Sequence, residues 1–188
     1  GTVLITGGTG GVGFDICRYL VKQANLKGLV LTGRRPETDE KVAGRLAEIR
    51  ALNPKIKITY VTANVGSEQE MKKVFDDINS GSPEEALVGV IHTAGTNDDG
   101  LIFNQSYERF AKLINSKIEG ALCIAKLTEG LNLKFTILFS SMTAFFGNRG
   151  QINYCTANMF LNKVCQFYRS HNGRKDIMSL ELAAWPSG

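Results

Sequence analysis

Four polar side chains in the second half of the sequence have the types and spacing that suit the reduction of a carbonyl group. Ser141 follows an apolar run, Tyr154 lies 13 residues later, and the remaining two are Asn158 and Lys117. Hydride addition to a carbonyl needs a proton donor at the developing alkoxide, and a tyrosine hydroxyl can be that donor. A nearby ammonium stabilises the tyrosinate left behind. A serine hydroxyl can donate a second hydrogen bond to the carbonyl oxygen.

Each of these side chains also has an ordinary structural interpretation. Ser141 could cap a loop, Lys117 could be a solvated helix charge, Tyr154 could be a packing residue, and Asn158 could be a surface amide. Tyr154 and Asn158 are four residues apart, which places them on one helical face. Because all four occur together with a glycine-rich turn, we favour the catalytic interpretation.

The glycine-rich turn at residues 6–13 has the form T-G-x-x-x-G-x-G. It follows an apolar run and opens a helical pattern, which is the context that gives such a motif meaning. Glycines let the backbone approach a pyrophosphate, and the helix N-terminus supplies free N–H groups. The alternative is a turn without a ligand. We expect a dinucleotide to contact Gly7, Thr9, Gly10, Gly11, Val12 and Gly13.

The end of the second expected strand favours NADPH over NADH. NAD-binding proteins place an acidic residue there to bind the ribose 2′-hydroxyl. Here the chain continues with Gly33, Arg34 and Arg35, and no acid occurs before Glu37. A guanidinium suits a phosphate dianion. The alternative is that both arginines are solvated loop charges.

Strand and helix patterns alternate along the chain, which predicts an α/β fold with a Rossmann-like, doubly wound parallel sheet in a single domain over residues 1–188. The first helix is expected to carry Val12, Ile16, Tyr19 and Leu20 on one face, and Ser67 and Glu70 form an expected capping box. The expected strands are 3–6, 28–32, 56–62, 87–92, 135–139 and 178–182, and the later helices are 40–52, 67–79, 107–130 and 153–170.

Composition excludes several classes of function. The net charge is +4 without a dense basic run, so we expect no nucleic-acid partner. No apolar stretch approaches the roughly 20 residues of a membrane span, and the first residues do not resemble a signal peptide. With two histidines and no C-x-x-C pair, no zinc site can be built. We therefore expect a cytoplasmic protein with no metal, whose thiols are free: Cys17, Cys123, Cys155 and Cys165.

Four segments together resemble the ketoreductase domain of type I polyketide synthases and animal-type fatty acid synthases, in the short-chain dehydrogenase/reductase superfamily. They are residues 6–13 (TGGTGGVG), 91–100 (IHTAGTNDDG), 139–142 (FSSM) and 150–158 (GQINYCTAN), and the resemblance spans essentially the whole chain. Stand-alone members of the superfamily use Tyr-x-x-x-Lys with an asparagine on the preceding helix. Here Asn158 and Lys117 have exchanged these places, as in the synthase ketoreductases.

This resemblance implies roles. Tyr154 would be the proton donor and Ser141 would hydrogen-bond the β-keto oxygen. Lys117 would bind the nicotinamide ribose and assist Tyr154, and Asn158 would hold Lys117 and the proton relay in place. The substrate would be a β-ketoacyl chain on the phosphopantetheine arm of an acyl carrier protein, with neighbouring synthase domains as further partners. Further cofactor contacts are expected from Asn64, Val65, Thr93, Ala94 and Gly95.

The family's stereochemical markers indicate a D-3-hydroxyacyl product. The loop after the fourth strand keeps Asp99 of the Leu-Asp-Asp motif, although the leucine is lost, and position 146 is Phe where the other class has Trp. Thr156 is not the proline associated with an epimerised α-methyl group. Asp99 and Gln151 are expected to wall the groove that the pantetheine arm enters. The alternative is that Asp98 and Asp99 are solvated acids.

Two features leave other functions open. The segment 179–185 (SLELAAW) lacks the first Trp and the Gly of the family pattern S-I-N-W-G-x-W, and the family's structural subdomain, lid and last strand are not found. The chain is therefore expected to be the catalytic half of a ketoreductase, truncated at both ends. The alternatives are a catalytically silent ketoreductase-like domain and a stand-alone dehydrogenase acting on a free small molecule.

Overall fold

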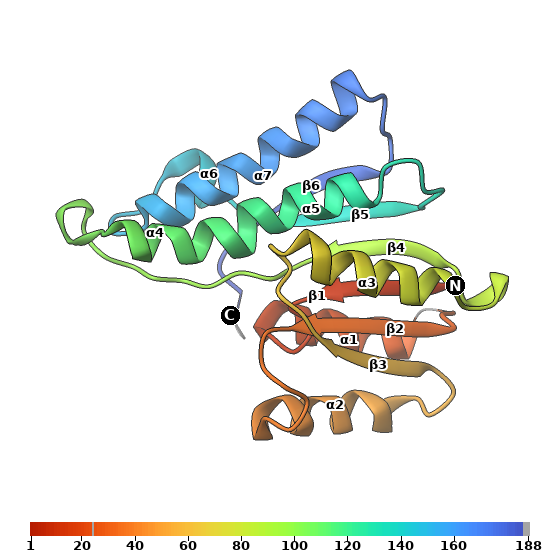
Figure 1. Ribbon diagram of the computed structural model, residues 1–188. Helices are drawn as coiled ribbons and strands as arrows, with labels where there is room; N and C mark the ends of the chain where they lie inside the picture. Colours follow the sequence, from red (N-terminus) through yellow and green to blue (C-terminus); the bar gives the residue numbers. More distant parts are fainter. Residues whose placement is uncertain (24, 186–188) are drawn as a thin grey trace.

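The computed structural model describes residues 1–23 and 25–185 and contains one parallel sheet (Figure 1). Every pair of neighbouring strands is parallel, in the order β3-β2-β1-β4-β5-β6. The order reverses between β1 and β4, the position at which such sheets bind ligands. The predicted fold class is confirmed. The strands are β1 Thr2–Thr6, β2 Gly28–Gly33, β3 Lys57–Thr62, β4 Leu87–His92, β5 Phe135–Ser141 and β6 Ile177–Leu182.

Helices connect the strands and form two layers, which can be followed in Figure 1. Within the described residues, no helix is long and apolar enough to span a bilayer. Short 3₁₀ turns occupy Pro83–Glu85 and Ile102–Asn104. The α-helices are α1 Gly11–Gln23, α2 Glu40–Leu52, α3 Glu68–Asn79, α4 Tyr107–Leu113, α5 Gly120–Leu127, α6 Thr143–Phe146 and α7 Ile152–His171.

The core lies on both faces of the sheet, because successive residues of a strand point to opposite sides. Leu4 of β1 packs in the cluster with α3, α5 and α7, whereas its neighbours Val3 and Ile5 pack with α1 and α2. Met178 and Leu180 of β6 stay 43% and 42% exposed. All four cysteines are free; three are buried and Cys155 is partly buried.

The buried face of α1 matches the predicted one only in part. Of the predicted residues, Ile16 and Leu20 pack against the core, whereas Tyr19 is 66% exposed. The buried side chains are Phe14, Cys17 and Val21. Gly13 faces the glycine turn, where a Cβ would lie 2.3 Å from the Gly7 carbonyl oxygen, and this close contact fixes which face of α1 meets the sheet.

The start of α3 forms only half of the predicted capping box. Ser67 Oγ accepts from Glu70 N (3.4 Å), as expected. The Glu70 carboxylate instead accepts from Asn64 N (2.8 Å), and Ser67 N donates to Asn64 O (2.9 Å). A turn at residues 64–67 satisfies the Ser67 amide, so the carboxylate reaches further back along the chain.

The helix predicted over residues 107–130 is continuous from Tyr107 to Leu127 but is not uniform. Between α4 and α5, residues Ile114–Glu119 form a π-helical segment. Such insertions widen one turn and occur frequently at functional sites. The segment contains Lys117, so the local widening directs that side chain.

Two helical glycines allow the close approach of α1 to be tested. Alanine at Gly13 would collide with the Gly7 backbone, whereas a Cβ at Gly44 of α2 meets nothing within 4 Å. We expect Gly44→Ala to raise the free energy of unfolding by about 1 kcal/mol, the usual gain in a helix interior, and Gly13→Ala to lower it. Chemical denaturation of the two variants measures this. Equal effects would contradict the packing described here.

Candidate active site and cofactor cleft

Three of the four side chains singled out in the sequence, those of Lys117, Tyr154 and Asn158, meet near the end of β5. Lys117 Nζ donates to Asn158 Oδ1 (2.8 Å) and to Phe139 O at the end of β5 (3.1 Å). The same ammonium lies 5.3 Å from the centre of the Tyr154 ring. Ser141 is the last residue of β5 rather than part of the following loop. Residues that are distant in the chain are thus brought into one polar cluster.

Asn158 connects the other members of this cluster. Its side chain is fully buried on α7. Its Oδ1 accepts from Lys117, and its Nδ2 donates to Tyr154 O (2.8 Å) one helical turn earlier. An ammonium needs an acceptor and a carbonyl needs a donor, so both contacts require the same amide orientation.

The Lys117 ammonium is buried, and burial lowers the pKa of this group to about 8. Gly95 makes room for its stem, because a Cβ at that position would lie 2.8 Å from Lys117 Cε. The cation has two oxygen acceptors and no carboxylate partner among the described residues. The site therefore holds a positive charge without neutralising it.

Ser141 is arranged as a hydrogen-bond donor. Its Oγ accepts from Thr143 N (3.2 Å) and from Thr143 Oγ1 (3.0 Å). These contacts occupy its lone pairs, and within the described part of the chain the Ser141 proton has no assigned acceptor. A carbonyl oxygen beside Tyr154 is the kind of group that this proton suits.

The loop after β4 is tied to the segment that precedes Tyr154. Gln151 Nε2 donates to Asp99 Oδ2 (2.9 Å), and Gly100 N donates to Gly150 O (2.7 Å). Asp98 has a different role, because its carboxylate pairs with Arg109 and this partner lowers the pKa of Asp98. The two residues predicted to line the substrate groove are thus hydrogen-bonded to each other, and Asp98 is not a solvated acid.

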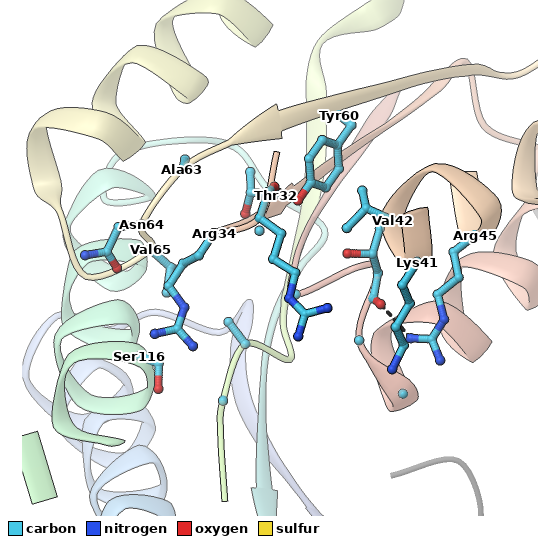
Figure 2. A pocket seen from close by; sticks show the side chains of 18 residues that line it. Thr32, Arg34, Lys41, Val42, Arg45, Tyr60, Ala63, Asn64, Val65 and Ser116 are labelled. Atoms are coloured by element: carbon cyan, nitrogen blue, oxygen red, sulfur yellow. Dashed lines mark hydrogen bonds between the residues drawn. The ribbon is translucent and has the colours of Figure 1, made fainter. Parts of the chain in front are cut away.

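A cleft of about 270 Å³ opens beside this cluster and contains most of the predicted cofactor residues (Figure 2). Eight lining residues were not predicted, and they come from β2, α2, β3, the loop after it, and the π-helical segment. The predicted residues that line it are Gly7, Thr9, Gly10, Gly11, Arg34, Arg35, Asn64, Val65, Ala94 and Gly95. The additional ones are Thr32, Gly33, Lys41, Val42, Arg45, Tyr60, Ala63 and Ser116.

Three predicted residues do not line the cleft but support its wall. A Cβ at Gly13 would come within 2.6 Å of Thr93 Oγ1, and that hydroxyl donates to Thr6 O (2.8 Å). Val12 lies in the first turn of α1 and also stands outside the lining. Gly13 and Thr93 therefore hold the glycine turn, α1 and the end of β4 together.

The lining fits a phosphate-rich dinucleotide. Gly7 has φ of +71°, and a Cβ there would lie 2.8 Å from Ala94 Cα, so only glycine fits at this position of the turn. Helix α1 begins at this turn. Its first N–H groups lack partners within the helix and can bind an anion. The lining carries four cationic side chains, and none of its residues is acidic among those the structure describes.

The unusual segment 179–185 includes the last residues of β6, which pair with the end of β5. Met142 N, just after Ser141, donates to Leu182 O (2.9 Å). Further along, Trp185 Nε1 donates to Asp15 Oδ2 on α1 (2.9 Å). This segment therefore contacts both the end of β5 and α1, although it departs from the expected pattern.

The chain is similar to a known protein family and to known proteins. The family described as "KR domain" matches residues 1–187. The chain is 35% identical over 171 residues to Mycoketide-CoA synthase of Mycobacterium tuberculosis and 34% identical over 190 residues to Polyketide synthase PksM of Bacillus subtilis. These alignments cover 91% and 99% of the chain but only 4% of each relative.

Solved structures of ketoreductases have the same fold as this chain. An N-terminal ketoreductase from the macrolactin assembly line aligns with a TM-score of 0.88 at 33% identity, covering 99% of this chain and 37% of that one. A ketoreductase domain from the bacillaene assembly line aligns with a TM-score of 0.90 at 28% identity, covering all of this chain and 45% of that one. The similarity extends over the whole sheet.

The buried Lys117 charge predicts a pH-dependent difference in stability. The Lys117 pKa is about 8 in the folded protein and about 10.4 in an unfolded chain, so the unfolded state binds the proton more tightly. The free energy of unfolding of the wild type, relative to Lys117→Met, should therefore rise by about 3 kcal/mol from pH 7 to pH 10.5. Chemical denaturation at both pH values measures this.

The difference between wild type and Lys117→Met removes the contribution of other titrating groups. Burial raises the pKa of Cys17 to about 12, so this thiol also makes stability depend on alkaline pH, but equally in both proteins. A difference that stays constant between the two pH values would contradict the buried, ionisable state assigned to Lys117.

Proposed function

The chain belongs to the KR domain family, and from this membership we propose that its 188 residues are the cofactor-binding catalytic unit of an NADPH-dependent ketoreductase in a polyketide synthase. The observation that carries the proposal is the contact of Lys117 with Asn158 beside the Tyr154 ring. The proposed reaction reduces a β-ketoacyl group on an acyl carrier protein to the 3-hydroxyacyl thioester.

The proposed cofactor is NADPH rather than NADH. Arg34 and Arg35 follow β2 and line the cleft, and no lining residue among those described is an acid that would bind a ribose 2′-hydroxyl. The reduced nicotinamide supplies a hydride to the substrate's carbonyl carbon. All other steps belong to the chain's own residues.

Tyr154 is the proposed acid of the reaction. As the carbonyl carbon gains the hydride, the oxygen becomes an alkoxide and takes the Tyr154 hydroxyl proton. Ser141 donates a hydrogen bond to the same oxygen, and the Lys117 ammonium stabilises the resulting tyrosinate. The tyrosinate then regains a proton from solvent along the path that Asn158 and Lys117 occupy. Lys117 would also hold the cofactor's nicotinamide ribose.

The proposed substrate carrier is the phosphopantetheine arm of an acyl carrier protein, and the other partners are neighbouring domains of the same synthase. Two observations support this. The relatives named above are large synthases of which this chain spans 4%, and Asn158 and Lys117 occupy the places that mark synthase ketoreductases. The same exchange argues against a stand-alone dehydrogenase acting on a free small molecule.

Removal of one hydroxyl tests the proposal. Tyr154→Phe should lower NADPH-dependent reduction of a β-ketoacyl thioester by about 10²–10⁴-fold, because the proton donor is lost, and should leave NADPH binding nearly intact. Tyr107→Phe is the matched control, since Tyr107 is 80% exposed and lies outside the site. Residual activity above one tenth of wild type would contradict the role of Tyr154. Absence of turnover in the wild type would favour a catalytically silent domain.

The configuration of the product tests the role given to the loop at Asp99. If Asp99 and Gln151 wall the groove, the pantetheine arm enters from one side and the product is the D-3-hydroxyacyl thioester. Chiral chromatography of the product measures this. A predominantly L-configured product would show that this hydrogen-bonded pair does not select the direction of entry.

A further inference from the structure

Helix α2 brings two cations to the cofactor cleft that lie outside the arginine pair after β2. Lys41 and Arg45 are one turn apart on this helix, and both line the cleft. In Figure 2 both side chains extend from α2 toward the cleft, and Arg34 enters it from the end of β2. Their neighbours Val42 and Leu46 are buried against the sheet, which fixes the rotation of the helix. The cleft is therefore bordered by cations from two separate elements.

Arg45 is held in place without being neutralised. Its Nη1 donates to Thr9 O in the glycine turn (2.6 Å), and its guanidinium lies 4.7 Å from the centre of the Phe14 ring. A guanidinium has five N–H donors in a rigid fork, and the contact with Thr9 uses one of them. The other donors remain available for a ligand in the cleft.

Other arginines in this part of the molecule differ from Arg45. Arg18 pairs with Glu48 (2.8 Å), and Arg50, which is also on α2, pairs with Glu37 (2.9 Å). Within the described residues Arg45 has no carboxylate within 4 Å. A cation that is oriented by a backbone carbonyl and an aromatic ring, and that faces a cleft lined by no described acid, is prepared for an anion.

The position of Arg45 in the fold indicates which anion of a dinucleotide it would meet. The glycine turn and the carboxyl end of β2 are the two elements that surround the adenosine ribose in a dinucleotide fold, and Arg45 spans from α2 to the glycine turn at Thr9. A phosphate monoester at the ribose carries a charge of about −1.5 to −2 at neutral pH. Cations on α2, together with those after β2, would meet this phosphate from two sides.

We propose that Arg45, assisted by Lys41, binds the cofactor's 2′-phosphate and is a major determinant of the preference for NADPH over NADH. This inference rests on the proposed function, because it requires a nicotinamide cofactor in the cleft. The competing account gives Arg45 a structural role only, in which it braces Thr9 and the glycine turn. That account predicts an equal loss of affinity for NADPH and for NADH in Arg45→Ala, because both cofactors contain the pyrophosphate that the turn would bind.

Calorimetric titration of the purified protein with NADPH, NADH and 2′,5′-ADP separates the two accounts. Arg45→Ala should lower the affinity for NADPH and for 2′,5′-ADP by about 10- to 100-fold, the usual effect of one charge-assisted hydrogen bond. The affinity for NADH should change by less than about twofold. Lys41→Ala should act in the same direction, several-fold. Arg50→Ala is the matched control on the same helix and should change none of the three.

A second variant removes the charge and keeps a polar side chain. In Arg45→Gln the side chain is neutral and too short to reach Thr9 O as Arg45 Nη1 does, so a purely structural role would weaken the binding of NADPH and NADH equally. We expect it instead to lose NADPH affinity as Arg45→Ala does and to keep NADH affinity near wild type. Equal loss of NADPH and NADH in Arg45→Ala, or unchanged NADPH affinity in Arg45→Gln, would overturn the inference and leave the proposed function standing. A wild-type protein that binds neither cofactor would overturn the proposed function itself.

Discussion

The candidate active site depends on how this chain accommodates one buried ammonium. Burial of a cation is costly unless oxygen acceptors surround it. Lys117 obtains these from the Asn158 amide and the Phe139 carbonyl, which belong to α7 and β5. The widened helical turn at residues 114–119 directs its side chain, and Gly95 at the end of β4 leaves space for its stem. A change in any of these elements would leave the charge without a partner or would move it away from Tyr154.

The proposed cofactor cleft is subject to a different constraint, because a dinucleotide there would bring negative charge close to the backbone. Gly7 allows the turn to approach Ala94 closely, and the cations of the lining come from the loop after β2 and from α2. The close packing of α1 through Gly13 brings the glycine turn next to the end of β4, and the Lys117 cluster lies beyond that strand. The proposed cofactor site and the proposed proton donor therefore lie at the same edge of one sheet.

Much of the fold could be predicted because it follows from local patterns. Strands buried on both faces appear as apolar runs, and α2 and β4 occupy the predicted residues. The candidate catalytic cluster could be predicted for a similar reason, because Tyr154 and Asn158 lie one helical turn apart in the sequence. The prediction for α1 was wrong at Tyr19, because the close contact of Gly13 with Gly7 lies between separate elements and fixes the rotation of the helix. Arg45 was missed because its contact with Thr9 spans 36 residues and leaves no periodic signal.

In the proposed reaction, a nicotinamide held in the cleft transfers a hydride to the β-keto carbon, and Tyr154, assisted by Lys117, supplies the proton. Deuterium tracing tests it most directly. The protein is incubated with NADPH that carries two deuterium atoms at C4 of the nicotinamide ring and with a β-ketoacyl thioester, and the product is analysed by mass spectrometry. We predict a 3-hydroxyacyl thioester with one deuterium at C3 for each cofactor oxidised. A product without deuterium at C3, or cofactor that binds but is never oxidised, would contradict the account.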